Sequence, residues 1–263
     1  MSQIETARMA TRVVLLGASN LTRCFPIVQC IAKQRLQSPV EIVVAMGHGR
    51  SYGQETKFFR KKFCGIIRSD LWSHLEQSKR MPTYALITDV GNDILYGVSV
   101  QTITQWVAEA IDRLQNWGAQ VVLTDLPLGS IRRLGKVRFQ LFRTCLFPAC
   151  RLSQETVMDR AETLSRSLQQ MAKDRNMTII KAKMQWYGLD PIHIRRSCAV
   201  AAWVEILSQW PGRTETLDCQ TSANYLTFYT HAVHQIVSSL GWPLQRADQP
   251  FRCLSDGSMC GQF

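Results

Sequence analysis

The chain has 263 residues, of which 46% are hydrophobic and 19% are charged. This composition excludes intrinsically disordered, collagen-like and fibrous proteins, and it fits one large α/β domain or two small ones. The longest early apolar run, Val13 to Leu16, is too short for a membrane span or the core of a signal peptide. We therefore expect a soluble, cytoplasmic protein.

The surface charge indicates the kind of partner that the protein attracts. Lys and Arg number 31 against 20 Asp and Glu, so the formal charge is +11, which favours phosphate, anionic lipid or acidic substrates. The segment 129–151 has no acid and carries Arg132, Arg133, Lys136, Arg138, Arg143 and Arg151. A solvated basic loop is the simple alternative to a binding role for this segment.

Metal-binding patterns are weak in this sequence. The nine cysteines never form the paired CxxC spacing of a zinc ribbon, so a reducing compartment is the simpler expectation. His231 and His234 lie three positions apart with Cys219 upstream, but no fourth ligand accompanies them. We expect no metal.

Short apolar runs alternate with segments of helical period along the chain. The runs at 13–16, 40–45, 85–88, 121–124 and 178–180 are mostly apolar throughout, as in strands buried on both faces of a parallel sheet. Helical stripes follow at 103–117, 157–171 and 200–210, with Gly118 as a predicted C′ residue and Ser153 as a predicted N-cap. The pattern predicts βαβ units with helices on both faces of a five-stranded sheet.

Two segments stand outside this alternation. Residues 127–150 are too long for an ordinary connection and are predicted to contain a helix of their own. The stretch from 241, with Pro243, Pro250 and a glycine-containing end, is predicted to be a C-terminal tail or appendage. We therefore divide the chain into a domain at 1–240 and a tail at 241–263.

Glycine-containing turns follow the first two predicted strands. The turn Gly17–Asn20 would leave Ser19 at the carboxyl edge of the sheet, near a helix N-terminus, although serine there is often only an N-cap. The turn Gly47–Gly53 is a near miss to a dinucleotide fingerprint, because its third glycine comes one residue late. A glycine N–H that faces a developing oxyanion is an equally physical use of this turn, and a plain tight loop is the simple alternative.

Two polar turns occur later in the chain. In Asp89–Asp93, the side-chain amide of Asn92 could donate a hydrogen bond into the same crevice, or the residues could form a turn for local reasons. In Asp190–His193, the carboxylate could orient the imidazole; the alternative is a helix start with Asp190 as N-cap and Pro191 in the first turn. Because parallel strands end at one edge of the sheet, the four turns could converge there.

This constellation resembles the SGNH hydrolases, also called GDSL-type esterases and lipases, over roughly residues 12–210. The resemblance implies a three-layer αβα sandwich with a flavodoxin-like parallel sheet of strand order 2-1-3-4-5. It implies that Ser19 is the nucleophile. It also implies that His193 is the general base, oriented by Asp190, since Asp190 to His193 matches the family's DxxH pattern.

The same resemblance implies an oxyanion hole made by the backbone N–H groups of Ser19 and Gly49 and the side chain of Asn92, with Gly53 as an alternative to Gly49. Two positions depart from the family's pattern. Ala18 stands where aspartate is usual, and Asp89 stands where the first glycine of GxND would be. Neither departure removes a group that attacks, accepts or donates. A GxSxG elbow is absent, so an α/β-hydrolase is not favoured.

We therefore expect a serine hydrolase that cleaves an ester or thioester through an acyl-enzyme at Ser19, without a metal or organic cofactor. Arg23, Arg50 and Arg195 are the expected substrate-binding residues, together with the segment 129–151, for an anionic ester or an acyl group on an anionic carrier. The alternatives are a carbohydrate acetyl esterase and a non-catalytic phosphate- or nucleic-acid-binding protein. The latter is weaker, because no nucleic-acid motif is present. The oligomeric state stays open.

Overall fold

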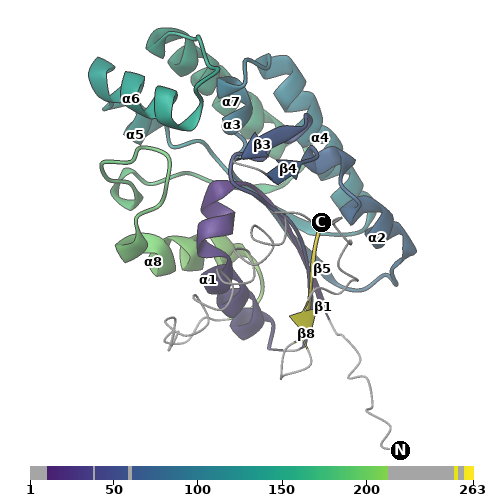
Figure 1. The fold of residues 1–263 in the computed structure, drawn as a ribbon. Helices are drawn as coiled ribbons and strands as arrows, with labels where there is room; N and C mark the ends of the chain where they lie inside the picture. The colour runs from purple at the N-terminus through teal and green to yellow at the C-terminus, as the bar shows by residue number, and fades with distance from the viewer. Residues whose placement is uncertain (1–10, 38, 59–60, 213–251, 254–257) are drawn as a thin grey trace, which may run out of the picture.

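The computed structural model describes residues 11–37, 39–58, 61–212, 252–253 and 258–263. Their centre is a sheet of strand order β7-β6-β5-β1-β2-β9-β8 (Figure 1). Its strands are β1 (Thr11–Leu16), β2 (Val40–Ala45), β5 (Thr83–Ile87), β6 (Gln120–Thr124), β7 (Thr178–Ile180), β8 (Arg252–Cys253) and β9 (Met259–Gln262). Neighbours pair in parallel except β8, which is antiparallel to β9.

The five strands predicted from apolar runs are all present, in the predicted order 2-1-3-4-5, as β2-β1-β5-β6-β7. Every residue of β1 is buried, and its register aligns Leu16 with Ala45 on one side and Ile87 on the other. The three strands therefore end at the same level. The turns that follow them meet at one edge, as expected for a parallel sheet.

The sheet is wider than the sequence pattern predicted, because the last residues of the chain join it. Met259–Gln262 form β9 beside β2, where we expected only a tail. The apolar pattern missed this strand because it is four residues long and contains a glycine. The boundary placed at residue 240 lies outside the described residues and stays a prediction.

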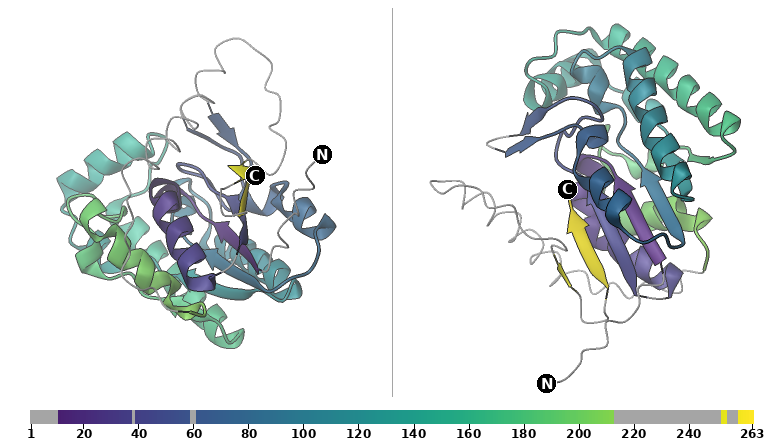
Figure 2. Two further views of the ribbon diagram at one scale, coloured as in Figure 1. Left: turned by 90° about the horizontal axis from the view of Figure 1, so that it is seen from below. Right: turned by 90° about the vertical axis from the view of Figure 1, so that its right-hand side faces the viewer.

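Helices cover both faces of the sheet (Figure 2). On one face, α1 (Ser19–Leu36) and α8 (Arg196–Ile206) pack with odd-numbered residues of β1, such as Val13 and Leu15. On the other face, α2 (Leu71–Gln77), α4 (Val100–Asn116) and α7 (Gln154–Asp174) pack with Val14 and Leu16. The alternation of side chains along a strand places these neighbours on opposite faces, which gives the predicted three-layer sandwich.

The predicted helix ends are confirmed where local chemistry sets them. The Ser153 side chain accepts a hydrogen bond from the N–H of Thr156 at the start of α7. Gly118 follows α4 with a φ of 76°, a left-handed conformation that glycine adopts without a steric penalty. The remaining short elements are α3 (Asn92–Leu95), the hairpin β3 (Thr56–Phe58) and β4 (Lys61–Phe63), and the 3-10 turns η1 (Ile66–Arg68), η2 (Met184–Trp186) and η3 (Leu207–Gln209).

The long segment after β6 contains two helices rather than the single helix predicted, α5 (Leu128–Arg132) and α6 (Lys136–Leu146). They lie beyond the carboxyl edge of the sheet, at the end where the turns meet (Figure 1). None of the helices in the described part of the chain combines the length and apolar character that a membrane crossing requires.

Candidate active site

Ser19, His193 and Asp190 form one hydrogen-bonded line, although Ser19 and His193 are 174 positions apart in the chain. The His193 Nε2 lies 2.9 Å from the Ser19 Oγ, and the His193 Nδ1 lies 2.6 Å from the Asp190 Oδ2. Ser19 is the first residue of α1, directly after the turn that leaves β1. The geometry is that of a nucleophile beside a base whose ring is held by a carboxylate.

Asp190 is held by its own loop. Its Oδ1 accepts the backbone N–H groups of Ile192 and His193 at 3.1 and 3.2 Å, which leaves Oδ2 for the imidazole. Burial by itself raises the pKa of Asp190, but the hydrogen bond and charge of His193 and the two N–H donors bring that pKa below its usual value. The group is therefore a carboxylate at neutral pH.

Three hydrogen-bond donors beside Ser19 are unused by the protein itself. The Asn92 Nδ2 is buried and has no partner among the described residues. The described residues also include no acceptor for the N–H groups of Ser19 and Gly49. Because a buried donor is normally satisfied, the unpartnered Asn92 Nδ2, together with the two backbone N–H groups, is placed as the donors of an oxyanion hole would be.

The structure distinguishes Gly49 from Gly53. Gly49 has a φ of 65°, its carbonyl accepts the Tyr96 hydroxyl at 2.6 Å, and it lines a cavity with Ser19 and Asn92. The Gly53 N–H donates instead to the Ser51 Oγ at 3.1 Å, and the glycine packs against Trp106. Gly49 is therefore the glycine that fits an oxyanion hole.

Asp89 organises the serine turn, a role that the sequence did not indicate. Its Oδ2 accepts hydrogen bonds from the N–H groups of Ala18, Asn20 and Leu21 at 2.9 to 3.2 Å. The N–H of Ser19, which lies between them in the sequence, is not bonded to Asp89. Its backbone is left-handed, with a φ of 61°, which aspartate tolerates better than most residues. Ala18 and Asp89, the two residues that depart from the SGNH pattern, are therefore in direct contact, because the Asp89 carboxylate accepts a hydrogen bond from the N–H of Ala18.

Asn20 connects the serine turn to the histidine loop, and it too was missed as a site residue. Its Nδ2 donates to the Asp89 Oδ1 and to the carbonyl of Ile192, each at 2.8 Å. Its Oδ1 accepts the N–H of Ile194 at 2.8 Å. The side chain therefore holds both neighbours of His193. No spacing rule could find this pairing, because it spans more than 170 positions.

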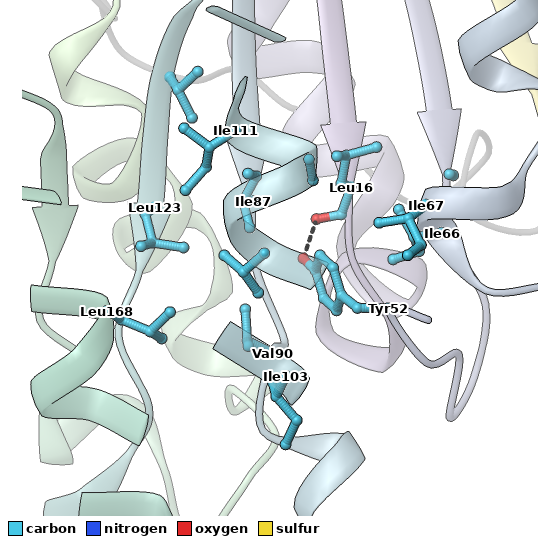
Figure 3. Packing of buried hydrophobic residues seen from close by; sticks show 14 of the residues in the cluster. Leu16, Tyr52, Ile66, Ile67, Ile87, Val90, Ile103, Ile111, Leu123 and Leu168 are labelled. Carbon is cyan, nitrogen blue, oxygen red and sulfur yellow. Dashed lines mark hydrogen bonds between the residues drawn. The ribbon is translucent and has the colours of Figure 1, made fainter. Parts of the chain in front are cut away.

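Asp93 connects the asparagine turn to the glycine turn. Its side chain is fully buried and accepts the hydroxyl of Ser51 and, at 2.9 Å, the N–H of Tyr52. Burial raises the pKa of Asp93 to about 6, against the opposing effect of these two donors. The Tyr52 hydroxyl in turn lies 3.3 Å from the Leu16 carbonyl at the end of β1, as Figure 3 shows within the core cluster.

Only one of the three arginines predicted to bind substrate borders the site. Arg23 lines the cavity at Ser19 and pairs with Asp190 at 3.8 Å. Arg50 is 2% exposed, and its guanidinium binds the carbonyls of Cys64 and Phe263, so the prediction for Arg50 is wrong. Arg195 donates to the Gln185 carbonyl and lines neither cavity, so its substrate role stays a prediction. Its neighbour Arg196 lines the open cavity.

Two cavities reach Ser19 and Asn92. One, of about 120 Å³, is mostly apolar and continues beneath α5 and α6, where it is lined by Leu126, Ile131, Leu134, Phe139 and Phe142, among others. The other, of about 810 Å³, is more open and also reaches His193. Its wall includes Arg23, Lys57, Arg151 and Arg196 and no Asp or Glu. One cavity surface is therefore mostly apolar, and the other is basic.

His48 also lines the open cavity. Burial, followed by electrostatic interaction with His193 and Arg23, lowers the pKa of His48, so His48 is neutral at physiological pH. Within the described ranges, no three His, Cys, Asp or Glu side chains gather as metal ligands would. The weak metal candidate Cys219, His231 and His234 lies outside the described residues.

Comparison with known proteins supports the fold. No protein-family model and no curated protein matches the chain. Among solved structures, an aryl esterase from M. smegmatis matches with a TM-score of 0.50 and 14% identity over 75% of this chain and 99% of the other. Est24, a carbohydrate acetylesterase from Sinorhizobium meliloti, matches with a TM-score of 0.51 and 11% identity over 75% and 99%. The chain has the fold of these esterases. The resemblance inferred from the four turns is thereby confirmed for the fold.

Proposed function

We propose that the protein is a serine ester hydrolase of the SGNH type that works through an acyl-enzyme at Ser19. The observation that carries this proposal is the contact of Ser19 with His193, next to three donors that the protein does not otherwise use. A lone serine hydroxyl is a weak nucleophile near neutral pH, and a base in contact with it removes that limitation.

In the acylation step, the Ser19 Oγ attacks the carbonyl carbon of the ester while His193 Nε2 takes the hydroxyl proton of Ser19. The carbonyl oxygen becomes an oxyanion, which accepts hydrogen bonds from the N–H groups of Ser19 and Gly49 and from Asn92 Nδ2. The Asp190 carboxylate stabilises the imidazolium. The imidazolium then protonates the departing alkoxide or thiolate. In deacylation, water attacks the acyl-enzyme, and His193 takes its proton and returns it to Ser19.

A fluorophosphonate probe tests the nucleophile directly. We expect stoichiometric labelling that maps to Ser19, and loss of both labelling and ester hydrolysis in Ser19→Ala. Ser197 is exposed and lies on α8 close to the histidine loop, so Ser197→Ala is the matched control and is expected to label normally. Labelling that persists in Ser19→Ala would remove the basis of the proposal.

The open cavity supports a preference for anionic esters or for acyl groups on an anionic carrier. Its wall contains no Asp or Glu and includes four basic residues, Arg23, Lys57, Arg151 and Arg196, of which Arg23 also pairs with Asp190. We expect Arg196→Gln to raise KM for an anionic ester about two- to fivefold, the range for one partly exposed ion pair. Arg195→Gln removes the same charge one position away, on a side chain that faces elsewhere, and is expected to leave KM unchanged.

Equal kcat/KM for neutral and anionic esters at all salt concentrations would contradict this preference while leaving the hydrolase proposal intact.

A carbohydrate acetyl esterase is the alternative within the fold. The apolar cavity beside Ser19 favours longer acyl groups than acetyl, because it continues to Phe139 and Phe142 beneath α6. A panel of esters from acetyl to dodecanoyl, with acetylated glycans beside it, separates the two substrates.

A further inference from the structure

The large apolar side chains that remain exposed lie around the proposed active site. Val137 is 84% exposed, Leu189 81% and Leu141 61%. The complete set among the described residues is Phe58, Val137, Leu141, Leu146, Met184 and Leu189. Single exposed apolar side chains are ordinary, but a set confined to one region marks an interaction surface.

The elements that carry these six side chains lie near one another, and we call the six residues the rim. The Arg138 guanidinium of α6 donates to the carbonyl of Leu189, so α6 lies against the loop that carries the catalytic histidine. Figure 1 shows α6 and the loop that leads into α8 on the same side of the molecule. Met184 lies near Gly129 of α5, and Phe58 and Leu146 line the open cavity with Ser19.

The helix α6 has apolar side chains on two faces, and only one of them is explained by packing. Its inner face places Phe139 and Phe142 in the wall of the apolar cavity. Its outer face presents Val137 and Leu141, one helical turn apart. This outer apolar pair is therefore available to a partner, because none of the described residues covers it.

Positive charge surrounds this outer face. Arg133, Lys136 and Arg138 are exposed, and the segment 129–151 contains no acid. Basic side chains between protruding apolar ones are the arrangement by which a helix lies in the surface of an anionic membrane. Long basic side chains can bury their methylene groups there and keep their charge among the lipid headgroups.

We propose that the rim docks on an anionic lipid surface, so that the apolar cavity beneath α6 opens toward the acyl chain of a lipid-borne ester. The docking needs no catalysis; only its use to collect substrate rests on the proposed function. A lipid surface fits better than a folded protein partner, because Val137 and Leu189 protrude singly with more than four fifths of their surface exposed. A protein would need a separate pocket for each, whereas a fluid surface accommodates both.

Vesicle co-sedimentation tests the docking with the full chain. The probe is a vesicle of phosphatidylcholine and phosphatidylglycerol in equal parts, with pure phosphatidylcholine as the neutral comparison. We expect binding to the anionic vesicle at least about tenfold tighter than to the neutral one, and weaker as salt is added. Val137→Gln/Leu141→Gln places a good helix former at both positions and is expected to weaken binding about tenfold or more.

Two double variants that remove the same charge at different places distinguish binding through the rim from attraction by the net charge of the protein. Arg133→Gln/Lys136→Gln is expected to weaken binding about thirtyfold, at about 1 kcal/mol for each basic side chain. Arg166→Gln/Lys173→Gln removes the same charge from exposed positions on α7 and is expected to leave binding within about twofold of wild type. Equal losses for the two pairs would mean non-specific attraction and would overturn the proposal.

Three further outcomes would also overturn it. The first is that the protein binds neither vesicle. The second is that the Val137→Gln/Leu141→Gln variant binds anionic vesicles as tightly as wild type. The third is that wild type self-associates in solution and this variant is monomeric. Binding of an acidic acyl carrier protein at the rim without vesicle binding would assign the surface to that partner instead. Ser19→Ala is expected to bind vesicles as wild type does. Hydrolysis of a neutral water-soluble ester by the Val137→Gln/Leu141→Gln variant is expected to be unchanged, because neither side chain lines a cavity beside Ser19. Failure of the docking and failure of the proposed hydrolysis are thus distinguished.

Discussion

The side chain of Asn92 offers a test in which activity and stability move in opposite directions. Its amide donates to nothing in the described part of the chain although it is buried, and it lines both cavities beside Ser19. An unsatisfied buried donor lowers the free energy of unfolding by about 1–3 kcal/mol, and by less where a bound water accepts its hydrogen bond. Asn92→Ala removes the donor, and alanine suits the first position of α3.

We therefore expect Asn92→Ala to leave the free energy of unfolding unchanged or to raise it by about 1 kcal/mol. The same substitution removes one preorganised oxyanion donor, which is worth about 2.7–4 kcal/mol of transition-state stabilisation, or about 10²- to 10³-fold in kcat. Because the contact forms only in the transition state, KM is expected to change little.

Hydrolysis of a soluble nitrophenyl ester and urea unfolding, measured on the same preparations, test both parts. Asn20→Ala is the contrasting variant: it breaks three side-chain hydrogen bonds, one to a carboxylate, so we expect a loss of about 3–5 kcal/mol of stability together with activity. A kcat for Asn92→Ala within about threefold of wild type, or an unfolding free energy lowered by about 2 kcal/mol or more, would refute the assigned role.

Three other substitutions test the groups that support the site. Asp89→Ala is expected to lower the free energy of unfolding by about 3 kcal/mol in urea titrations, because it frees four donors and strains a left-handed residue; Asp89→Asn, which tolerates that backbone, should lose less. Burial raises the folded-state pKa of Asp93 to about 6, above its unfolded value, so the stability of wild type relative to Asp93→Asn should fall as pH rises from about 4 to about 6. A difference between the two proteins that is flat across this range would contradict the buried acid. Arg50→Lys is expected to cost about 2 kcal/mol of stability through lost carbonyl contacts, with KM for anionic esters unchanged; a raised KM would return Arg50 to the substrate site.

The sequence by itself determined the five central strands, the two helix layers and the four turns, because each depends on local patterns. The strand order followed from the resemblance of the four turns to SGNH hydrolases. Uniformly apolar runs such as that of β1 predict strands buried on both faces, and parallel strands bring their turns to one edge. The short DxxH pattern likewise predicted the Asp190 to His193 pairing, since three positions separate the two residues. The strand β9 was not predicted because its four residues, Met259–Gln262, are too few to show an apolar run or an alternation.

Only the tertiary structure decided which polar side chains support the site and which merely lie near it in the sequence. Asn20 and Asp89 act across 172 and 69 positions, distances over which no periodicity extends. Arg50 and Arg195 adjoin the site's turns in the sequence, yet their side chains point elsewhere, since the direction of a side chain depends on the packing of the folded chain. Local pattern determines where the backbone turns, and long-range packing determines what each side chain meets there.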